Sequence, residues 1–285
     1  MDKINLSKFD EISSLSCVES YLLFIFDISD IEYRHLYSQS FISFNDLSHD
    51  FINRKTKYAF YDGVPRLQET ADQYNLIDME SINSAYINSI CETNTFLFIK
   101  IKPSFIEKKY GKTMWRDDHY MLIVDCSDEY WTCVNDNPRD IIRMTKSEVL
   151  SSLYDGKQII IKLLSGITTE IKRSLLNDFR NGMSKQKKVY KIDQIADEIP
   201  IRDMIGVLRV LRRRLFEYCS LYIECNFMHD YIKYLDKTYS MIEYLRLRGK
   251  LSGDKLQEII MNIDKKDSEL VEIIKEKMKG VYYEP

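Results

Sequence analysis

Three side chains that could act together chemically lie far apart in this chain of 285 residues: the thiol of Cys17, the imidazole of His119 and the carboxylate of Asp136. A thiol attacks a carbonyl carbon once a nearby base has taken its proton, and a third group commonly orients that base. The combination predicts nucleophilic chemistry at a carbonyl, provided that the fold brings the three residues together.

The imidazole and the carboxylate belong to two expected strands that are joined by a short acidic turn. Residues 119–124 (HYMLIV) and 130–134 (YWTCV) are rich in the β-branched and aromatic residues that favour strands. A hairpin centred between Ser127 and Asp128 pairs Leu122 with Cys133. The two segments are therefore expected to form an antiparallel hairpin.

The same register places His119 opposite Asp136. Directly opposed side chains share one face of a sheet, with Cβ atoms about 4.5–5.5 Å apart, so the carboxylate could accept a hydrogen bond from the ring. The turn lacks the Asn-Gly or Asp-Gly pair that fixes a register, and a slip of one residue would bring Asn135 to the ring instead. The other interpretation is that His119 is an ordinary polar residue at a strand end.

Cys17 stands at the expected start of a helix. Ser14 or Ser16 can cap that helix, which places the thiol in the first turn of an amphipathic run. Unpaired backbone N–H groups and the positive end of the helix dipole favour the thiolate there, and they could also stabilise an oxyanion. The alternative is that Cys17 is a small buried residue that packs a helix start.

The order and setting of these residues resemble the papain-like cysteine peptidase fold over residues 8–165. The match is closest to the bacteriocin-processing peptidases and the butirosin-type (BtrH-type) acyltransferases. In that branch a Cys opens the first long helix, "HY" begins a strand, and the return strand ends in an Asp near a Pro. Here these features are Cys17, His119 in "HYMLIV" and Asp136 in "VNDNP".

The resemblance implies a cysteine-nucleophile acyltransferase that forms an amide bond through an acyl-enzyme on Cys17, in thiotemplated secondary-metabolite biosynthesis. It is also similar to the amide-forming enzymes of closthioamide assembly. The implied donor is an acyl or peptidyl carrier protein with a phosphopantetheine thioester, the acceptor is a small amine or diamine, and no cofactor is implied. Two alternatives stay open: a cysteine peptidase or thioester hydrolase, and a non-catalytic binding protein on the same fold.

Residues just before the histidine are candidates for binding the substrate. Trp115 could line an acyl or amine pocket, and Asp117 and Asp118 would suit a cationic amine, although an ordinary polar loop explains them as well. Asn135 is a further candidate beside the catalytic set.

Four arginines, Arg209, Arg212, Arg213 and Arg214, occur in one helical stretch. They either form a solvated face that pairs with carboxylates, or they bind an acidic carrier protein or its phosphate.

The fold class expected from the pattern is α+β, with a papain-like domain at 1–165 and an all-helical domain at 166–285. In the first domain, a helix that carries the Cys packs on an antiparallel sheet. The expected strands are 95–103, 119–124, 130–134 and 157–164, and the expected helices are 16–27, about 66–91, 168–182, a long tract from 200 to 247, and 252 or 254 to 280.

Composition excludes several other classes of function. A net charge of −3 and a pI near 5.9 give no basic surface for nucleic acid. No apolar stretch approaches the roughly 20 residues of a membrane span, and no signal peptide is recognisable, so a cytoplasmic protein is expected. The six cysteines form no CxxC pair, and the four histidines lack metal-ligand spacing, so no metal site is expected.

Overall fold

The computed structural model describes residues 14–58, 61–83, 87, 95–111, 119–127, 129–136, 138–154, 157–184 and 198–281. The chain divides into two compact units. We call Met1–Glu32 with Gln68–Ile167 the sheet unit, and Tyr33–Leu67 with Thr168–Pro285 the helical unit. The expected boundary at residue 165 lies near the last crossing between the units. The segment 33–67, which the sequence had placed in the first domain, belongs with the helices instead.

The sheet unit is built on a six-stranded antiparallel sheet, which confirms the α+β class. The strands are β1 (Ile77–Asn83), β2 (Thr95–Ile101), β3 (His119–Cys126), β4 (Tyr130–Asp136), β5 (Arg139–Thr145) and β6 (Lys157–Leu163). Their order is β1-β6-β2-β3-β4-β5. The helices of this unit are α1 (Cys17–Ile28), α3 (Leu67–Gln73), α4 (Pro103–Tyr110) and α5 (Lys146–Ser152).

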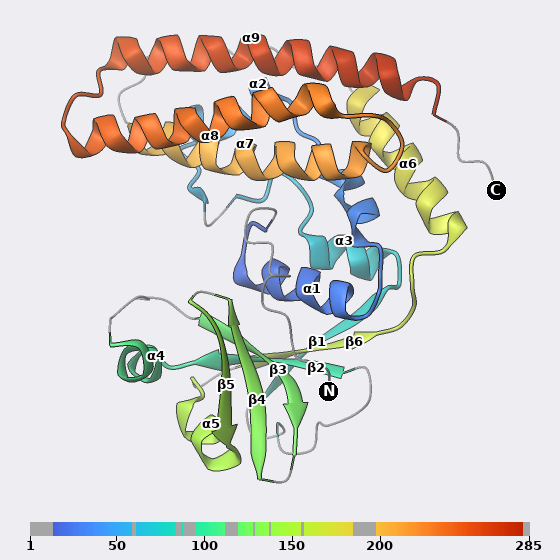
Figure 1. The fold of residues 1–285 in the computed structure, drawn as a ribbon, viewed down its shortest axis with the longest axis vertical. Helices are drawn as coiled ribbons and strands as arrows, with labels where there is room; N and C mark the ends of the chain where they lie inside the picture. The colour runs from blue at the N-terminus through green and yellow to red at the C-terminus, as the bar shows by residue number, and fades with distance from the viewer. Residues whose placement is uncertain are drawn as a thin grey trace. The chain divides into compact units, whose positions relative to one another are not determined.

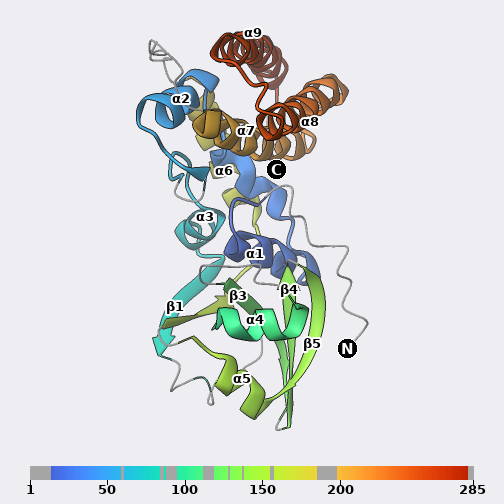
Figure 2. The ribbon, with the colours of Figure 1, turned by 90° about the vertical axis from the view of Figure 1, so that its left-hand side faces the viewer.

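Alternation along the central strands gives the sheet two apolar faces. On one face, Phe98 of β2, Leu122 of β3 and Val134 of β4 are paired in register, and Phe98 lies against Tyr21 of α1 with ring centroids 5.7 Å apart. The opposite face carries a larger cluster that includes Trp131 and residues of α4 and α5. Helix α1 therefore covers one face, and α4 and α5 lie on the other (Figures 1 and 2).

Two of the six strands were not expected from the sequence. The expected helix at about 66–91 is wrong over residues 77–83, because α3 ends in a turn in which the N–H of Leu76 donates to the carbonyl of Ala71 at 2.9 Å, and a strand follows. Residues 84–86 and 88–91 of that prediction lie outside the described residues. Asn75 takes the left-handed conformation in that turn (φ 53°), as helix C-terminal motifs require. Strand β1 follows as an edge strand. Its exposed, polar residues carry little strand signal, so pairing with β6 determines its structure.

Within its described residues, the helical unit contains four long or medium helices and three short ones. These are α2 (Phe44–Ser48), α6 (Thr169–Ser184), α7 (Glu198–Cys219), α8 (Asn226–Leu247) and α9 (Gly253–Met278), with a 3-10 helix at Tyr33–Gln39 and a π-helical turn at His49–Asn53. The tract expected from 200 to 247 is two helices, because the chain turns between Cys219 and Asn226. Gly249 then ends the α8 region with φ 62°.

A buried ion pair joins two helices of this unit to the segment 33–67. The Arg212 guanidinium donates to both Asp267 carboxylate oxygens, at 2.6 and 2.7 Å, and to the backbone carbonyl of Ile42 at 2.9 Å. Both charged side chains are essentially inaccessible to solvent. Arg212 of α7 therefore connects α9 with the segment 33–67.

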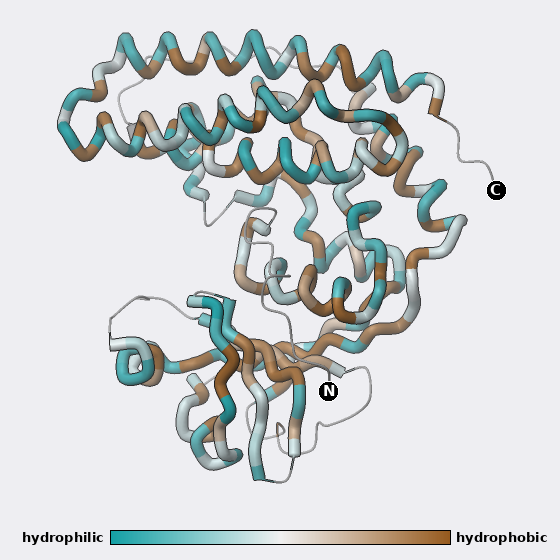
Figure 3. The backbone as a smooth tube through the Cα atoms, viewed as in Figure 1, coloured by the Kyte–Doolittle hydropathy of each residue, from teal (hydrophilic) through white to brown (hydrophobic). Residues whose placement is uncertain are grey.

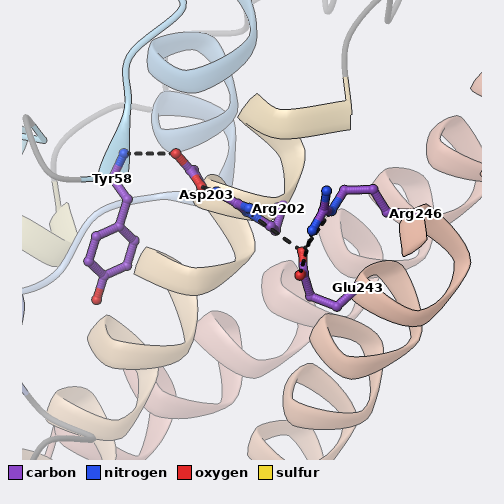
Figure 4. Close-up of polar contacts among 5 residues, drawn as sticks. All are labelled: Tyr58, Arg202, Asp203, Glu243 and Arg246. Carbon is purple, nitrogen blue, oxygen red and sulfur yellow. Dashed lines mark hydrogen bonds and ion pairs between the residues drawn. The ribbon is translucent and has the colours of Figure 1, made fainter. Parts of the chain in front are cut away.

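A series of hydrogen bonds and ion pairs connects Tyr58, near the end of the segment 33–67, to α7 and α8 (Figure 4). Asp203 accepts hydrogen bonds from the backbone N–H of Tyr58 at 3.2 Å and from Arg202 at 2.7 Å. Arg202 also lies 3.7 Å from Glu243, which pairs with Arg246 at 3.1 Å. These contacts explain why residues 33–58 pack with helices α7 and α8, which begin at Glu198 and Asn226, far later in the chain.

The hydropathy of the residues differs between the elements of the two units. Figure 3 shows α1 and the central strands as mostly apolar, whereas α9 alternates between polar and apolar residues along its length. Within the described ranges, no helix combines the length and the apolar character that crossing a membrane requires.

We predict that Asp267→Asn destabilises the helical unit by about 3–5 kcal/mol, because it leaves the Arg212 charge buried without a counter-charge. Asp236→Asn is the matched control: its partners Arg209 and Arg213 are partly exposed, and such pairs contribute about 0–1 kcal/mol. Urea unfolding followed by circular dichroism measures both losses. Equal losses would contradict the structural role of the Arg212–Asp267 pair.

Candidate active site

Cys17 is the first residue of α1, as the sequence predicted. Ser16 is the N-cap, and its hydroxyl accepts a hydrogen bond from the backbone N–H of Glu19 at 3.2 Å. The buried Glu19 carboxylate accepts in turn from the N–H of Leu15 at 2.6 Å. The capping residues thus fix the position at which the helix begins and where the thiol lies.

The β3–β4 register differs by one residue from the expected one. Leu122 pairs with Val134 rather than with Cys133, and an irregularity between Ile123 and Asp125 shifts the pairing again near the turn. The expected pairing of His119 with Asp136 is therefore wrong. Continuing the observed register places Asn135 opposite Met121, on the face of the sheet that His119 shares.

Asn135 is accordingly the nearer partner of the imidazole. His119 Nε2 lies 2.6 Å from Asn135 Oδ1 and 3.5 Å from Asp136 Oδ1. The Asn135 amide nitrogen donates to the carbonyl of Pro138 at 2.8 Å, which fixes the orientation of the amide and turns Oδ1 towards the ring. Because Oδ1 can only accept, Nε2 carries the proton in neutral His119, and Nδ1 is the basic nitrogen.

The sulfur of Cys17 lies at the start of β3. The backbone N–H groups of Tyr120, Val18 and Cys17 donate hydrogen bonds to it, and all three lower its pKa. Since Tyr120 directly follows His119 in the chain, this contact brings the thiol to the same strand end as the imidazole. The structure thus assembles Cys17, His119, Asn135 and Asp136 within the sheet unit.

The thiol is nonetheless protonated at neutral pH. Burial, and then the negative charge of Asp136, raise the pKa of Cys17 to about 11, against the smaller effect of the three N–H groups. The N–H groups at the helix start favour the thiolate, as expected, but burial and the Asp136 charge outweigh them in the resting protein. A nucleophile has to be generated during the reaction by transferring the thiol proton to a base.

Tyr21 is a central residue of the site that the sequence analysis missed. Its hydroxyl donates to the carbonyl of Tyr120 at 2.7 Å, accepts from the N–H of Asp136 at 3.1 Å and lies 3.2 Å from Asp136 Oδ1. Burial, and then the Asp136 charge, raise the pKa of Tyr21 well above its ordinary value, so the phenol stays neutral. Its position one helical turn after Cys17, on the same face of α1, could have identified it.

Other candidate residues do not join this site. Trp115, Asp117 and Asp118 lie outside the described residues. Arg209 and Arg213 both pair with Asp236, at 2.7 and 2.6 Å.

The other two arginines are buried. Arg212 pairs with Asp267, and Arg214 lies over the ring of Tyr37. The four arginines thus contribute to packing within the helical unit. Among the described residues, no group of three or more His, Cys, Asp or Glu side chains could hold a metal ion.

Neither a comparison with protein-family models nor a search of curated proteins found a match for this chain.

We predict that the rate at which iodoacetamide labels Cys17 rises about tenfold per pH unit from pH 7 to pH 10, because only the thiolate reacts and its pKa is about 11. Asp136→Asn should increase the rate at pH 8, since it removes a negative charge that raises this pKa. Peptide mass spectrometry measures both effects.

The matched control is Asp125→Asn, which removes an exposed carboxylate on the neighbouring strand β3 and should leave the labelling rate unchanged. A plateau in the wild-type rate below pH 9 would contradict a neutral thiol.

Proposed function

We propose that this protein is a cysteine-dependent acyltransferase that takes an acyl group from a thioester onto Cys17 and passes it to an amine. The observation that carries the proposal is that the Cys17 sulfur accepts a hydrogen bond from the N–H of Tyr120, the residue that directly follows His119. Asn135 holds the His119 ring with Nδ1 as its basic nitrogen. A thiol, a base and a group that orients the base are the components of covalent acyl transfer.

In the first step, the Cys17 sulfur attacks the carbonyl carbon of the donor while His119 takes the thiol proton. Backbone N–H groups at the start of α1 can stabilise the oxyanion of the tetrahedral intermediate. The intermediate collapses with cleavage of the donor C–S bond, and His119 returns the proton to the departing thiolate. The products are a free donor thiol and an acyl group on Cys17.

In the second step, the nitrogen of a neutral amine attacks the acyl carbon, and His119 takes a proton from it. Cleavage of the bond to Cys17 releases the amide, and the proton restores the thiol. A thiol of high pKa is a poor leaving group, so the raised pKa of Cys17 slows breakdown of the acyl-enzyme by water and by amine alike. Transfer to an amine therefore requires that the amine is held close to the acyl carbon and that water is excluded.

The identity of the donor and acceptor follows from the family resemblance alone. We propose a carrier protein with a phosphopantetheine thioester as the donor, and a small amine or diamine as the acceptor. The phosphopantetheine belongs to the carrier protein, so the chain itself would need no cofactor. A cysteine peptidase or thioester hydrolase would use the same first half-reaction and differ in admitting water.

We predict that the intact protein gains the mass of one hexanoyl group when treated with hexanoyl-N-acetylcysteamine, and that Cys17→Ala does not. Cys126→Ala, which removes another partly exposed thiol, is the control and should acylate normally. Adding an amine should then release mainly amide. Release of mainly acid at saturating amine would favour the hydrolase, and absence of an adduct would favour a binding protein.

We further predict that Asn135→Ala slows acylation more than Asp136→Asn does. His119→Ala should lose the roughly 10²–10⁴-fold contribution of a general base, and Asn135→Ala a large part of it, because the ring loses its orientation. Asp136→Asn removes a charge that disfavours the thiolate and keeps the shape of the site, so its loss should stay below about tenfold. Quenched time courses of acylation measure these rates. A larger loss of rate in Asp136→Asn than in Asn135→Ala would make Asp136 the orienting group.

A further inference from the structure

Tyr110 is the last residue of α4, and its side chain lies beside that of Asn135. Helix α4 ends there because Gly111 takes the left-handed conformation (φ 69°) and its N–H donates to the carbonyl of Glu107 at 2.8 Å. The Tyr110 ring packs against the apolar cluster on this face of the sheet. Its hydroxyl forms a hydrogen bond with the Asn135 side chain. The end of α4 thus contacts the residue that orients His119.

Asp140 is a second partner of the Tyr110 hydroxyl. It lies directly opposite Asn135 in the β4–β5 register, so the two side chains share one face of the sheet. The Tyr110 hydroxyl donates to Asp140 Oδ2 at 3.2 Å. Burial, and then the Asp140 charge, raise the pKa of Tyr110 above its ordinary value, so the phenol keeps its proton at neutral pH.

The hydrogen bonds of this series each have a fixed direction. A carboxylate only accepts, so the Tyr110 O–H donates to Asp140 and the phenol oxygen is left to accept. The Asn135 amide nitrogen has two N–H bonds: one donates to the carbonyl of Pro138 at 2.8 Å, and the other remains for the Tyr110 oxygen. The amide oxygen is thereby turned to His119 Nε2, at 2.6 Å.

These contacts exclude the reversed orientation of the Asn135 amide. A reversed amide would present its nitrogen to His119, so Nε2 would have to accept and the ring proton would move to Nδ1. Its oxygen would then face two other acceptors, the carbonyl of Pro138 and the oxygen of Tyr110. Asp140 maintains the second of these, because it holds the hydroxyl proton that could otherwise turn to the amide oxygen.

We infer that Tyr110 and Asp140 are positioning residues that hold the Asn135 amide and, through it, the tautomer of His119. Their consequence for acyl transfer rests on the proposed function, because it requires Nδ1 of His119 to be the base. Their effect on the ring itself does not, since the tautomer can be measured without a substrate.

The test is nuclear magnetic resonance of the full chain labelled with ¹⁵N-histidine, at a pH at which the ring is neutral. The signals of His119 are identified by their loss in His119→Ala. In the wild type, the ring proton should lie on Nε2 and exchange slowly with water. Tyr110→Phe removes only the hydroxyl and should speed this exchange at least tenfold or move part of the proton to Nδ1. Asp140→Ala should act in the same direction.

Tyr130→Phe is the matched control, because it removes an exposed hydroxyl from β4, the strand of Asn135. It should leave the His119 signals as they are in the wild type.

A double variant separates positioning from a general loss of structure. If Asp140 acts only through Tyr110, combining Tyr110→Phe with Asp140→Ala should change the His119 signals no more than Tyr110→Phe alone does. Two independent effects on the structure would add instead. Each single variant should slow the acylation of Cys17 by about fivefold, as expected for the loss of one hydrogen bond of average strength.

Unchanged His119 signals in Tyr110→Phe would overturn the inference, and so would a double variant that shows the sum of the single effects. If Tyr110→Phe does not fold, Asp140→Ala decides, because Asp140 is only half-buried and lies on β5, the last strand in the sheet order. Altered signals in a protein that forms no adduct with hexanoyl-N-acetylcysteamine would contradict the proposed function and leave this inference standing.

Discussion

The hydrogen bond between His119 Nε2 and Asn135 Oδ1 determines what the rest of the site can do. The Asn135 amide cannot rotate to present its nitrogen, because that nitrogen is bonded to the carbonyl of Pro138. The bond therefore fixes both the tautomer and the direction of the ring. A reversed amide would accept no proton from Nε2, and the imidazole would lose its basic nitrogen on the other side.

The burial of this site also keeps the Cys17 thiol uncharged in the resting protein. Taking the Cys17 thiol out of water beside Asp136 disfavours its thiolate more than three N–H groups favour it. Tyr21 keeps Asp136 at this position through its hydroxyl, and its own ionisation is suppressed by the same burial and charge. The thiol is therefore neutral at rest, and the thiolate forms only when a base takes its proton during the reaction.

Local features of the site could be predicted from the sequence, whereas features that depend on distant pairing could not. The cap at Ser16 and the four apolar strands follow from side-chain chemistry within a few residues. The register of β3 and β4 does not, because a turn without glycine and an irregularity after Ile123 shift it by one residue. Because of this shift of one residue, Asn135 and not Asp136 is the nearest partner of the His119 imidazole.

The division into units has a consequence for how the site is held. Helix α1, which carries Cys17, leads directly into the segment 33–67, and that segment folds with the helices that follow residue 168. Its apolar residues Leu36, Phe44, Leu47 and Phe51 are fully buried there. A chain cut after residue 165 would keep this segment and lose the helices that cover it, so it would expose a large apolar surface. Loss of activity in such a truncated chain would therefore reflect the fate of residues 33–67 as much as any role of α6 to α9 in catalysis. Point substitutions within one unit, which leave the other intact, are the sound way to assign functions to the two units.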